Sequence, residues 1–175
     1  MKKLFFLLLF NFLIPNNLIL DLDDSYIRYY GNHPLHSWVG ESEDFIFELN
    51  NNNDKFSIFI SAKVNSFDSK NENRDSNMLY YLESFKYPDV TFKSNHINFD
   101  TLNQINMING ILNFHGIEKN ITINIDLNEN QSDLIGKCFF DINLNDYNIE
   151  RPKLLMLPID NKIKLEAQIV LKNEK

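Results

Sequence analysis

The 175-residue sequence contains few cysteines, glycines and basic residues, and each shortage excludes a class of protein. Its one cysteine, Cys138, cannot form an intramolecular disulfide and is interpreted as a small apolar strand residue. Five glycines, with no phosphate-cradling glycine loop and no long helical period, do not fit a nucleotide-binding fold of alternating strands and helices. Seventeen Lys and Arg against 24 Asp and Glu give a net charge of −7, which argues against nucleic acid and an anionic membrane face as partners.

Residues with catalytic or metal-binding chemistry are too scattered to form a site. The four histidines are His33, His36, His96 and His115. Two flank a proline in a predicted turn, one falls on a predicted strand and one in another turn, whereas zinc needs three or four converging ligands. No Gly-x-Ser-x-Gly nucleophile motif is present, and the acidic clusters are interpreted as solvated turns. The sequence therefore predicts no catalytic residue, no metal site and no cofactor.

The first residues have the pattern of an export signal. Lys2 and Lys3 precede an apolar run of about ten residues, which is too short to span a bilayer comfortably. We expect residues 1–20 to be a signal peptide, with the cleavage site left open and an uncleaved anchor as the alternative. The domain at 21–175 would then be periplasmic or secreted, with no stable membrane span after cleavage.

Short segments of alternating polarity fill the rest of the chain. Eight strands are predicted, at 25–30, 38–49, 56–64, 90–99, 105–114, 117–127, 134–144 and 163–171. The alternation is clearest at 117–127, where Ile121, Ile123 and Ile125 share one face and Thr122 and Asn124 the other. A period of two residues indicates one buried and one solvated face.

One stretch, 67–94, interrupts this series of strands. A polar loop passes through Arg74 and Asp75 into a short apolar helix, predicted from Met78 to Phe85, and Pro88 separates that helix from the next strand. The helix carries too much apolar surface to remain in water, so it must pack on the strands. Arg74 and Asp75 are expected to pin the loop to the helix start.

Many short strands at hairpin spacing predict an all-β antiparallel sandwich or barrel. Eight strands that close into a barrel remove exposed edges and can enclose one small ligand. The fifteen phenylalanines are either a dense core or the walls of an apolar cavity, and composition leaves both open. The segment at 149–158 is expected to be an irregular loop. The sequence also leaves the oligomeric state open, a dimer included.

Three ordered motifs resemble those of the YceI-like family. Residues 66–69 followed by 73–78 resemble the family's "SfdtGn…RDxhl" segment, and 86–94 resembles its "kyPxitFxS" strand. Residues 110–119 resemble "GxLtihGvtk", and 121–123 continue it.

Several positions depart from this family pattern. Lys70 stands at the usual glycine and Asn77 at the usual histidine of the loop, so the geometry of the loop need not be copied. Glu118 and Asn120 replace a common threonine and proline.

The resemblance implies a lipocalin-like eight-stranded antiparallel barrel, with a short helix in the loop after the third strand. It implies an exported, non-catalytic protein that holds a polyisoprenoid or other long-chain amphiphile in its lumen. The helix would then be a flap at the entrance. The candidate ligand-binding residues, at the entrance and on the wall, are Met78, Leu82, Phe85, Tyr87, Phe92, Ile123, Ile125, Phe140, Ile142 and Leu165.

Two other functions remain open from the sequence. A barrel with a filled core and no ligand could serve as a protein-interaction or stress-response module of the cell envelope. An enzyme acting on an isoprenoid quinone or lipid would need a polar constellation facing the lumen, and the sequence displays none.

Overall fold

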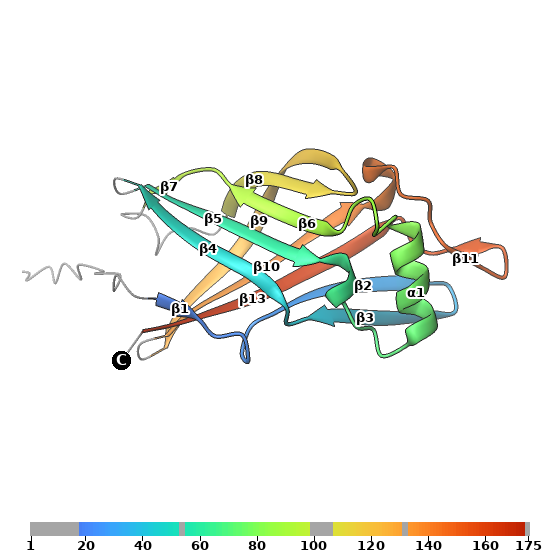
Figure 1. Cartoon of the computed structure of the whole chain (residues 1–175), viewed down its shortest axis with the longest axis horizontal. Helices are drawn as coiled ribbons and strands as arrows, with labels where there is room; N and C mark the ends of the chain where they lie inside the picture. The colour runs from blue at the N-terminus through green and yellow to red at the C-terminus, as the bar shows by residue number, and fades with distance from the viewer. Residues whose placement is uncertain (1–17, 53–54, 99–106, 131–132, 174–175) are drawn as a thin grey trace, which may run out of the picture.

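The computed structural model describes residues 18–52, 55–98, 107–130 and 133–173. Within these ranges the chain forms a strongly curled antiparallel sheet with one α-helix at the end farther from β1 (Figure 1). The elements are β1 (Leu18–Leu20), β2 (Tyr26–His33), β3 (His36–Ser42), β4 (Phe45–Asn52), β5 (Lys55–Lys63), η1 (Val64–Ser66), α1 (Glu72–Tyr81), β6 (Asp89–Ser94), β7 (Ile97–Asn98), β8 (Met107–Phe114), β9 (Ile117–Asn130), β10 (Asp133–Asn143), η3 (Leu144–Tyr147), β11 (Lys153–Leu154), β12 (Leu157–Pro158) and β13 (Lys162–Asn173).

The sheet follows the order β3-β2-β13-β10-β9-β8-β6-β5-β4, with β1 added to β13 and β7 added to β5. Its two end strands, β3 and β4, are consecutive in the chain, so the sheet curls on itself as a half-barrel. The predicted class, an all-β antiparallel lipocalin-like fold with a helix after the strand at 56–64, is confirmed. The predicted count of eight strands is not confirmed, because the continuous path holds nine.

The predicted strand at 38–49 is two strands, and this prediction was wrong. β3 ends at Ser42 and β4 begins at Phe45. The Ser42 hydroxyl bonds to both the backbone N–H and the carbonyl of Asp44, and its oxygen lies 2.7 Å from that of Ser66. These bonds turn the backbone between the strands, since a serine hydroxyl competes with the ladder for backbone groups.

Other boundaries also differ from the sequence prediction. The predicted strand at 90–99 is two strands in the described residues, β6 and β7, and His96 lies between them. The turn expected at 33–37 shortens to Pro34–Leu35, because β2 continues to His33 and β3 starts at His36. The expected irregular loop at 149–158 contains the small hairpin of β11 and β12. The helix begins at Glu72, six residues before the predicted start, because Asn71 accepts a hydrogen bond from the Arg74 backbone N–H and caps it.

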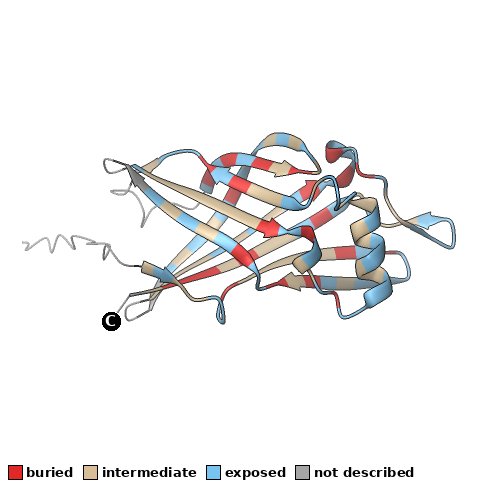
Figure 2. Ribbon diagram, viewed as in Figure 1, coloured by how far each residue is buried: buried red, intermediate tan, exposed pale blue. Residues whose placement is uncertain are grey.

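Alternation along the strands places the core inside the curl. On β9, Ile123 is buried between exposed Thr122 and Asn124, as predicted, and it is the register partner of buried Ile108 on β8. Figure 2 shows this alternation of buried and exposed residues along the strands. Two clusters form the core: a large one around Phe92, Leu112 and Tyr147, and a smaller one around Phe45 and Leu171.

Three residues of the expected leader, Leu18–Leu20, lie in the described part of the chain. Residues 1–17 lie outside the described part of the chain, while Leu18–Leu20 form β1, which pairs with β13 at Leu20↔Leu171. No helix in the described ranges has the length and apolar character needed to cross a membrane.

Candidate functional site

A cavity of about 540 Å³ lies inside the curl of the sheet and under α1. Ligand pockets in proteins generally measure about 300–1,000 Å³. Its walls come from strands β2, β3, β5, β6, β8, β9, β10 and β13, and its lining draws on both core clusters. The curled sheet therefore encloses open volume and is not packed solid.

The walls of the cavity are apolar because the inward-facing residues of neighbouring strands are cross-strand partners, and these residues are mostly apolar. Phe140 on β10, Leu165 on β13 and Tyr29 on β2 are adjacent partners in one row, and Cys138, Ala167 and Ile27 form the next. All six residues line the cavity. A chain of methylene or prenyl groups could therefore be buried along several strands at once.

The open end of the cavity lies beside α1 and the β11–β12 hairpin. Residues that both line the cavity and are exposed to solvent mark this end: His36, Asn71, Asn73, Asn77, Lys153 and Leu154. Figure 1 places α1 and β11 together at the same end of the molecule. We call this end the cavity mouth. It is polar on the α1 side.

Seven of the ten candidate residues from the sequence line this cavity. They are Met78, Leu82, Phe92, Ile123, Phe140, Ile142 and Leu165. Two come from α1 and the residue after it, and the other five come from four strands of the wall. The structure thus brings both expected groups, entrance and wall, to one space.

The other three candidates do not line the cavity. Phe85 is fully exposed in the turn that follows α1, where Glu83 has a left-handed φ of 45°. The Tyr87 ring packs on His115, with 4.5 Å between ring centroids, at the β8–β9 turn. Ile125 packs partly buried against the large core cluster.

Tyr29 and Trp38 also line the cavity, although neither was among the residues predicted from the sequence. Each is the cross-strand partner of a glycine: Tyr29 of Gly40, and Trp38 of Gly31. A Cβ on either glycine would clash with the ring opposite it. The two glycines therefore leave the space in which both rings lie against the β2–β3 hairpin.

The hydrogen-bonding atoms of these two residues are buried. Within the part of the chain that the structure describes, Tyr29 Oη and Trp38 Nε1 have no partner with hydrogen-bond geometry. Burial raises the pKa of the Tyr29 phenol. Trp38 and Ser69 lower that pKa, but neither meets the geometry of a hydrogen bond to the phenol oxygen. Because an unpaired buried donor is costly, these atoms suit a ligand oxygen.

The loop before α1 is held to the helix by side-chain bonds. The Asp75 carboxylate accepts from the Ser69 backbone N–H at 3.2 Å and from the Ser69 hydroxyl at 2.6 Å. Arg74 Nη1 donates to the Ser69 carbonyl at 3.3 Å, and its guanidinium lies 5.1 Å from the centre of the Trp38 ring. Arg74 and Asp75 lie in the first turn of α1, where their bonds to Ser69 hold the loop to the helix start, and Arg74 also lines the cavity.

The histidines at the mouth are engaged in structural contacts. His33 is buried; its Nδ1 accepts from the Leu35 backbone N–H at 3.2 Å, and its Nε2 donates to the Leu157 carbonyl at 3.1 Å. The rings of His33, His36 and Trp38 follow one another at 5.6 and 5.4 Å. In the described ranges, no group of three or more His, Cys, Asp or Glu residues is placed to hold a metal ion.

The YceI-like domain model matches residues 20–171 of the chain. The chain belongs to the YceI-like family. No curated protein sequence matches the chain significantly.

Solved structures of other proteins show the same fold. Burkholderia cenocepacia BcnA is similar with a TM-score of 0.74 and 17% identity, covering 87% of this chain and 99% of that one. A polyisoprenoid binding domain from Saccharophagus degradans, implicated in plant cell wall breakdown, has a TM-score of 0.72 and 14% identity, covering 89% and 97%. The Campylobacter jejuni YCEI protein has a TM-score of 0.56 and 18% identity, covering 78% and 84%. At such low identities the likeness establishes the fold.

Lys70 shows how the family's glycine position is accommodated here. It keeps a left-handed backbone with φ of 60°, the conformation that glycine adopts at least cost. Its backbone N–H donates to Asp68 Oδ1 at 2.6 Å, and its Nζ pairs with the other carboxylate oxygen at 2.8 Å.

Lys70→Gly is expected to raise Tm by roughly 2–4 °C, because it relieves the left-handed strain of a side chain with a Cβ. Both partners of the Lys70–Asp68 ion pair are exposed, so its loss offsets little of this gain. Lys63→Gly is the matched control, since Lys63 has an extended backbone with φ of −75° and glycine there lowers Tm. Thermal unfolding by circular dichroism measures both, and a fall in Tm for Lys70→Gly would contradict the strain.

The single cysteine reports on the cavity. Cys138 lines it, and burial raises the pKa of its thiol to about 11. Because the thiolate is the nucleophile, we expect the rate of alkylation to keep rising about tenfold per pH unit from pH 8 to pH 10. An unperturbed thiol would level off near its pKa of about 8.5. Stopped-flow labelling with an apolar maleimide measures the profile, and an early plateau would show that the thiol is accessible to water.

Proposed function

We propose that this YceI-like protein is a non-catalytic carrier that holds a polyisoprenoid or other long-chain amphiphilic lipid in its cavity, in the periplasm or outside the cell. The observation that carries the proposal is the apolar cavity of about 540 Å³ inside the curled sheet. The similar domain from Saccharophagus degradans is a polyisoprenoid binding domain, which supports the same ligand class.

Binding would proceed by partition of the chain from water into the cavity. Each methylene that leaves water contributes about 0.8 kcal/mol, so a few prenyl units suffice for micromolar affinity. The open volume also favours this function over a ligand-free interaction module, which needs a filled core. No step requires a bond to form or break.

The polar head of the ligand would lie at Tyr29 and Trp38. The indole N–H is a donor only, and the phenol can donate or accept, so the head needs at least one acceptor oxygen. A quinone or amide carbonyl and a prenyl phosphate share this chemistry. Arg74 above the Trp38 ring would favour the charged member of the group.

Trp38, the one tryptophan of the chain, provides the test because it lines the cavity. We expect its emission to change saturably on titration with a short-chain prenyl quinone, a fatty amide or a prenyl phosphate. The rank of the three affinities identifies the head. A protein of similar size that has an exposed tryptophan and binds no lipid is titrated in parallel. It controls for collisional quenching of the emission by the quinone. If none of the three probes changes the emission, and Cys138 labelling is equally fast with and without them, the carrier function is excluded.

A further inference from the structure

The β11–β12 hairpin exposes four consecutive apolar residues, Leu154, Leu155, Met156 and Leu157, which we call the apolar tip. Their exposed fractions are 46%, 76%, 90% and 46%. Isolated exposed apolar residues are common on soluble proteins, whereas a contiguous apolar group marks an interaction site.

The turn itself does not explain these residues. Leu155 and Met156 have φ of 51° and 68°, the left-handed values of a turn that ordinarily takes Asn and Gly. Leucine and methionine are poor choices for that backbone on steric grounds. Their apolar side chains therefore point to a role outside the fold of the hairpin.

The tip is mounted rigidly at the cavity mouth. The Ile159 N–H bonds to the Pro152 carbonyl at 2.9 Å, and Arg151 Nη1 donates to the Ile159 carbonyl at 3.2 Å. His33 ties the hairpin to β2 through the Leu157 carbonyl. Lys153 and Leu154 also line the cavity.

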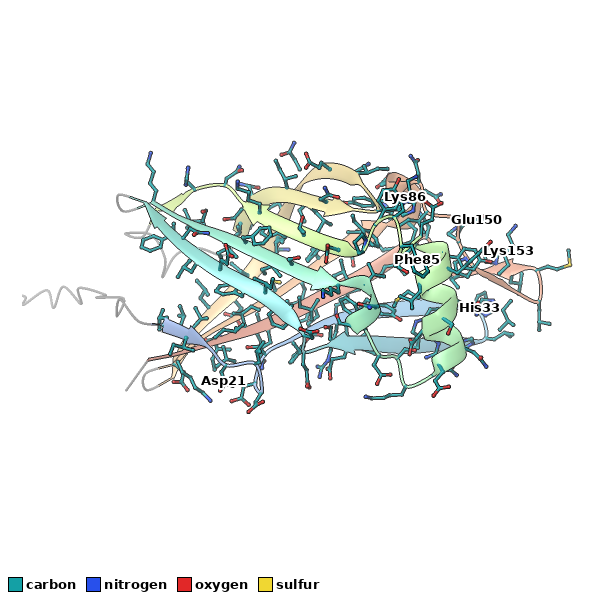
Figure 3. The ribbon with its side chains drawn as sticks, viewed as in Figure 1. Asp21, His33, Phe85, Lys86, Glu150 and Lys153 are labelled. Carbon is teal, nitrogen blue, oxygen red and sulfur yellow. The ribbon has the colours of Figure 1, made fainter. Side chains whose placement is uncertain are left out.

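The hairpin projects beyond the sheet beside α1 (Figure 1), and Figure 3 places Lys153, His33 and Phe85 at that same end. Phe85, which does not line the cavity, is fully exposed at this end. The end of the molecule that opens the cavity is thus also the end that carries these exposed apolar side chains.

The charge around the tip differs from that of the whole chain. From Arg151 to Ile159 there are two cations, Arg151 and Lys153, and no acid, whereas the chain carries a net charge of −7. Acids flank this segment at Glu150 and Asp160, and the Asp160 carboxylate accepts a hydrogen bond from the Asn32 side chain at 2.6 Å. Locally the hairpin suits lipid phosphates, although the chain as a whole does not.

We propose that the apolar tip inserts into the surface of a phospholipid bilayer and holds the cavity mouth against it. Apolar side chains would enter the acyl boundary while Arg151 and Lys153 meet the phosphates, as in other interfacial anchors. A convex tip fits a fluid surface, which needs no matching groove. The purpose of docking, passage of a lipid between bilayer and cavity, rests on the proposed carrier function; docking itself does not.

Vesicle co-sedimentation of the full chain tests the docking, with phosphatidylcholine alone and with phosphatidylcholine mixed with phosphatidylglycerol. We expect Met156→Asp to weaken binding to both vesicles about tenfold or more, since one buried methionine side chain accounts for at least that factor. Met107→Asp is the matched control, an equally charged change at an exposed methionine on β8, and should bind as the unmodified protein does. Lys153→Gln should weaken binding only to the anionic vesicles, with a reduced salt dependence.

The outcomes separate docking from carriage. Met156→Asp should keep the Trp38 response to a soluble short-chain probe, because Met156 does not line the cavity. Vesicle binding without any probe response would leave docking standing and remove the carrier function. If the unmodified protein binds neither kind of vesicle, or if Met156→Asp binds them as tightly as the unmodified protein does, the docking proposal is overturned. A concentration-dependent dimer that Met156→Asp abolishes, without vesicle binding, would assign the tip to a second copy and also overturn it.

Discussion

Ala167→Phe is expected to weaken lipid binding about a hundredfold while the protein stays folded. Ala167 is 7% exposed, lines the cavity and stands in register between Cys138 and Ile27. A benzyl group there would occupy the middle of the lumen and displace three or four methylenes of the ligand. At about 0.8 kcal/mol for each methylene, that loss corresponds to roughly a hundredfold in Kd.

The matched series is Ala167→Val, which adds less volume at the same position and should give an intermediate loss. Titration of Trp38 emission measures the affinity, and far-UV circular dichroism with thermal unfolding checks the fold. Overpacking can cost stability, so affinity is compared only among variants that unfold cooperatively. A folded Ala167→Phe protein that binds as tightly as the original would place the ligand outside the cavity.

Tyr147→Ala is expected to lower the free energy of unfolding by about 3–5 kcal/mol, the usual cost of removing a buried aromatic ring. Tyr147 is 2% exposed in the large core cluster, and its ring packs on Phe114 with 5.4 Å between centroids. Its carbonyl accepts from His115 Nδ1 at 2.8 Å, which ties η3 to the β8–β9 turn. The cavity left by truncation would loosen the same end of the sheet that carries the mouth.

Tyr80→Ala is the control for this change, because Tyr80 is 76% exposed on α1 and its loss should cost little. Tyr147→Phe keeps the buried ring and should cost far less than Tyr147→Ala. Urea unfolding followed by circular dichroism gives all three values. Equal effects of Tyr147→Ala and Tyr80→Ala would show that Tyr147 is not a core residue.

The alternation of the strands made the fold and most of the wall predictable. Ile123 could be placed inward because Thr122 and Asn124 flank it. Four other wall candidates came from the same alternation, which does not by itself decide which face is the lumen, and all four line the cavity. The break between β3 and β4 could not be predicted in this way, because it depends on Ser66, which is 24 positions away from Ser42. Phe85 lies outside the cavity, in the turn after α1 where Glu83 has a left-handed backbone. The composition of the sequence does not encode that conformation.

Tyr29 and Trp38 were missed although the sequence carried a signal. Tyr29 and Gly40 stand at equal distances from the Pro34–Leu35 turn, as do Gly31 and Trp38. A hairpin about that turn pairs each aromatic residue with a glycine, which leaves room for the ring. Their unpaired polar atoms depend on tertiary packing and could be found only in the structure.

Native mass spectrometry of the protein purified from its own host, followed by solvent extraction, decides whether the cavity carries a lipid. We expect a complex heavier than the chain by the mass of one long-chain amphiphile, which organic solvent releases and which Ala167→Phe fails to retain. A bare chain from the host, together with no uptake of added prenyl chains or fatty amides, would contradict lipid carriage.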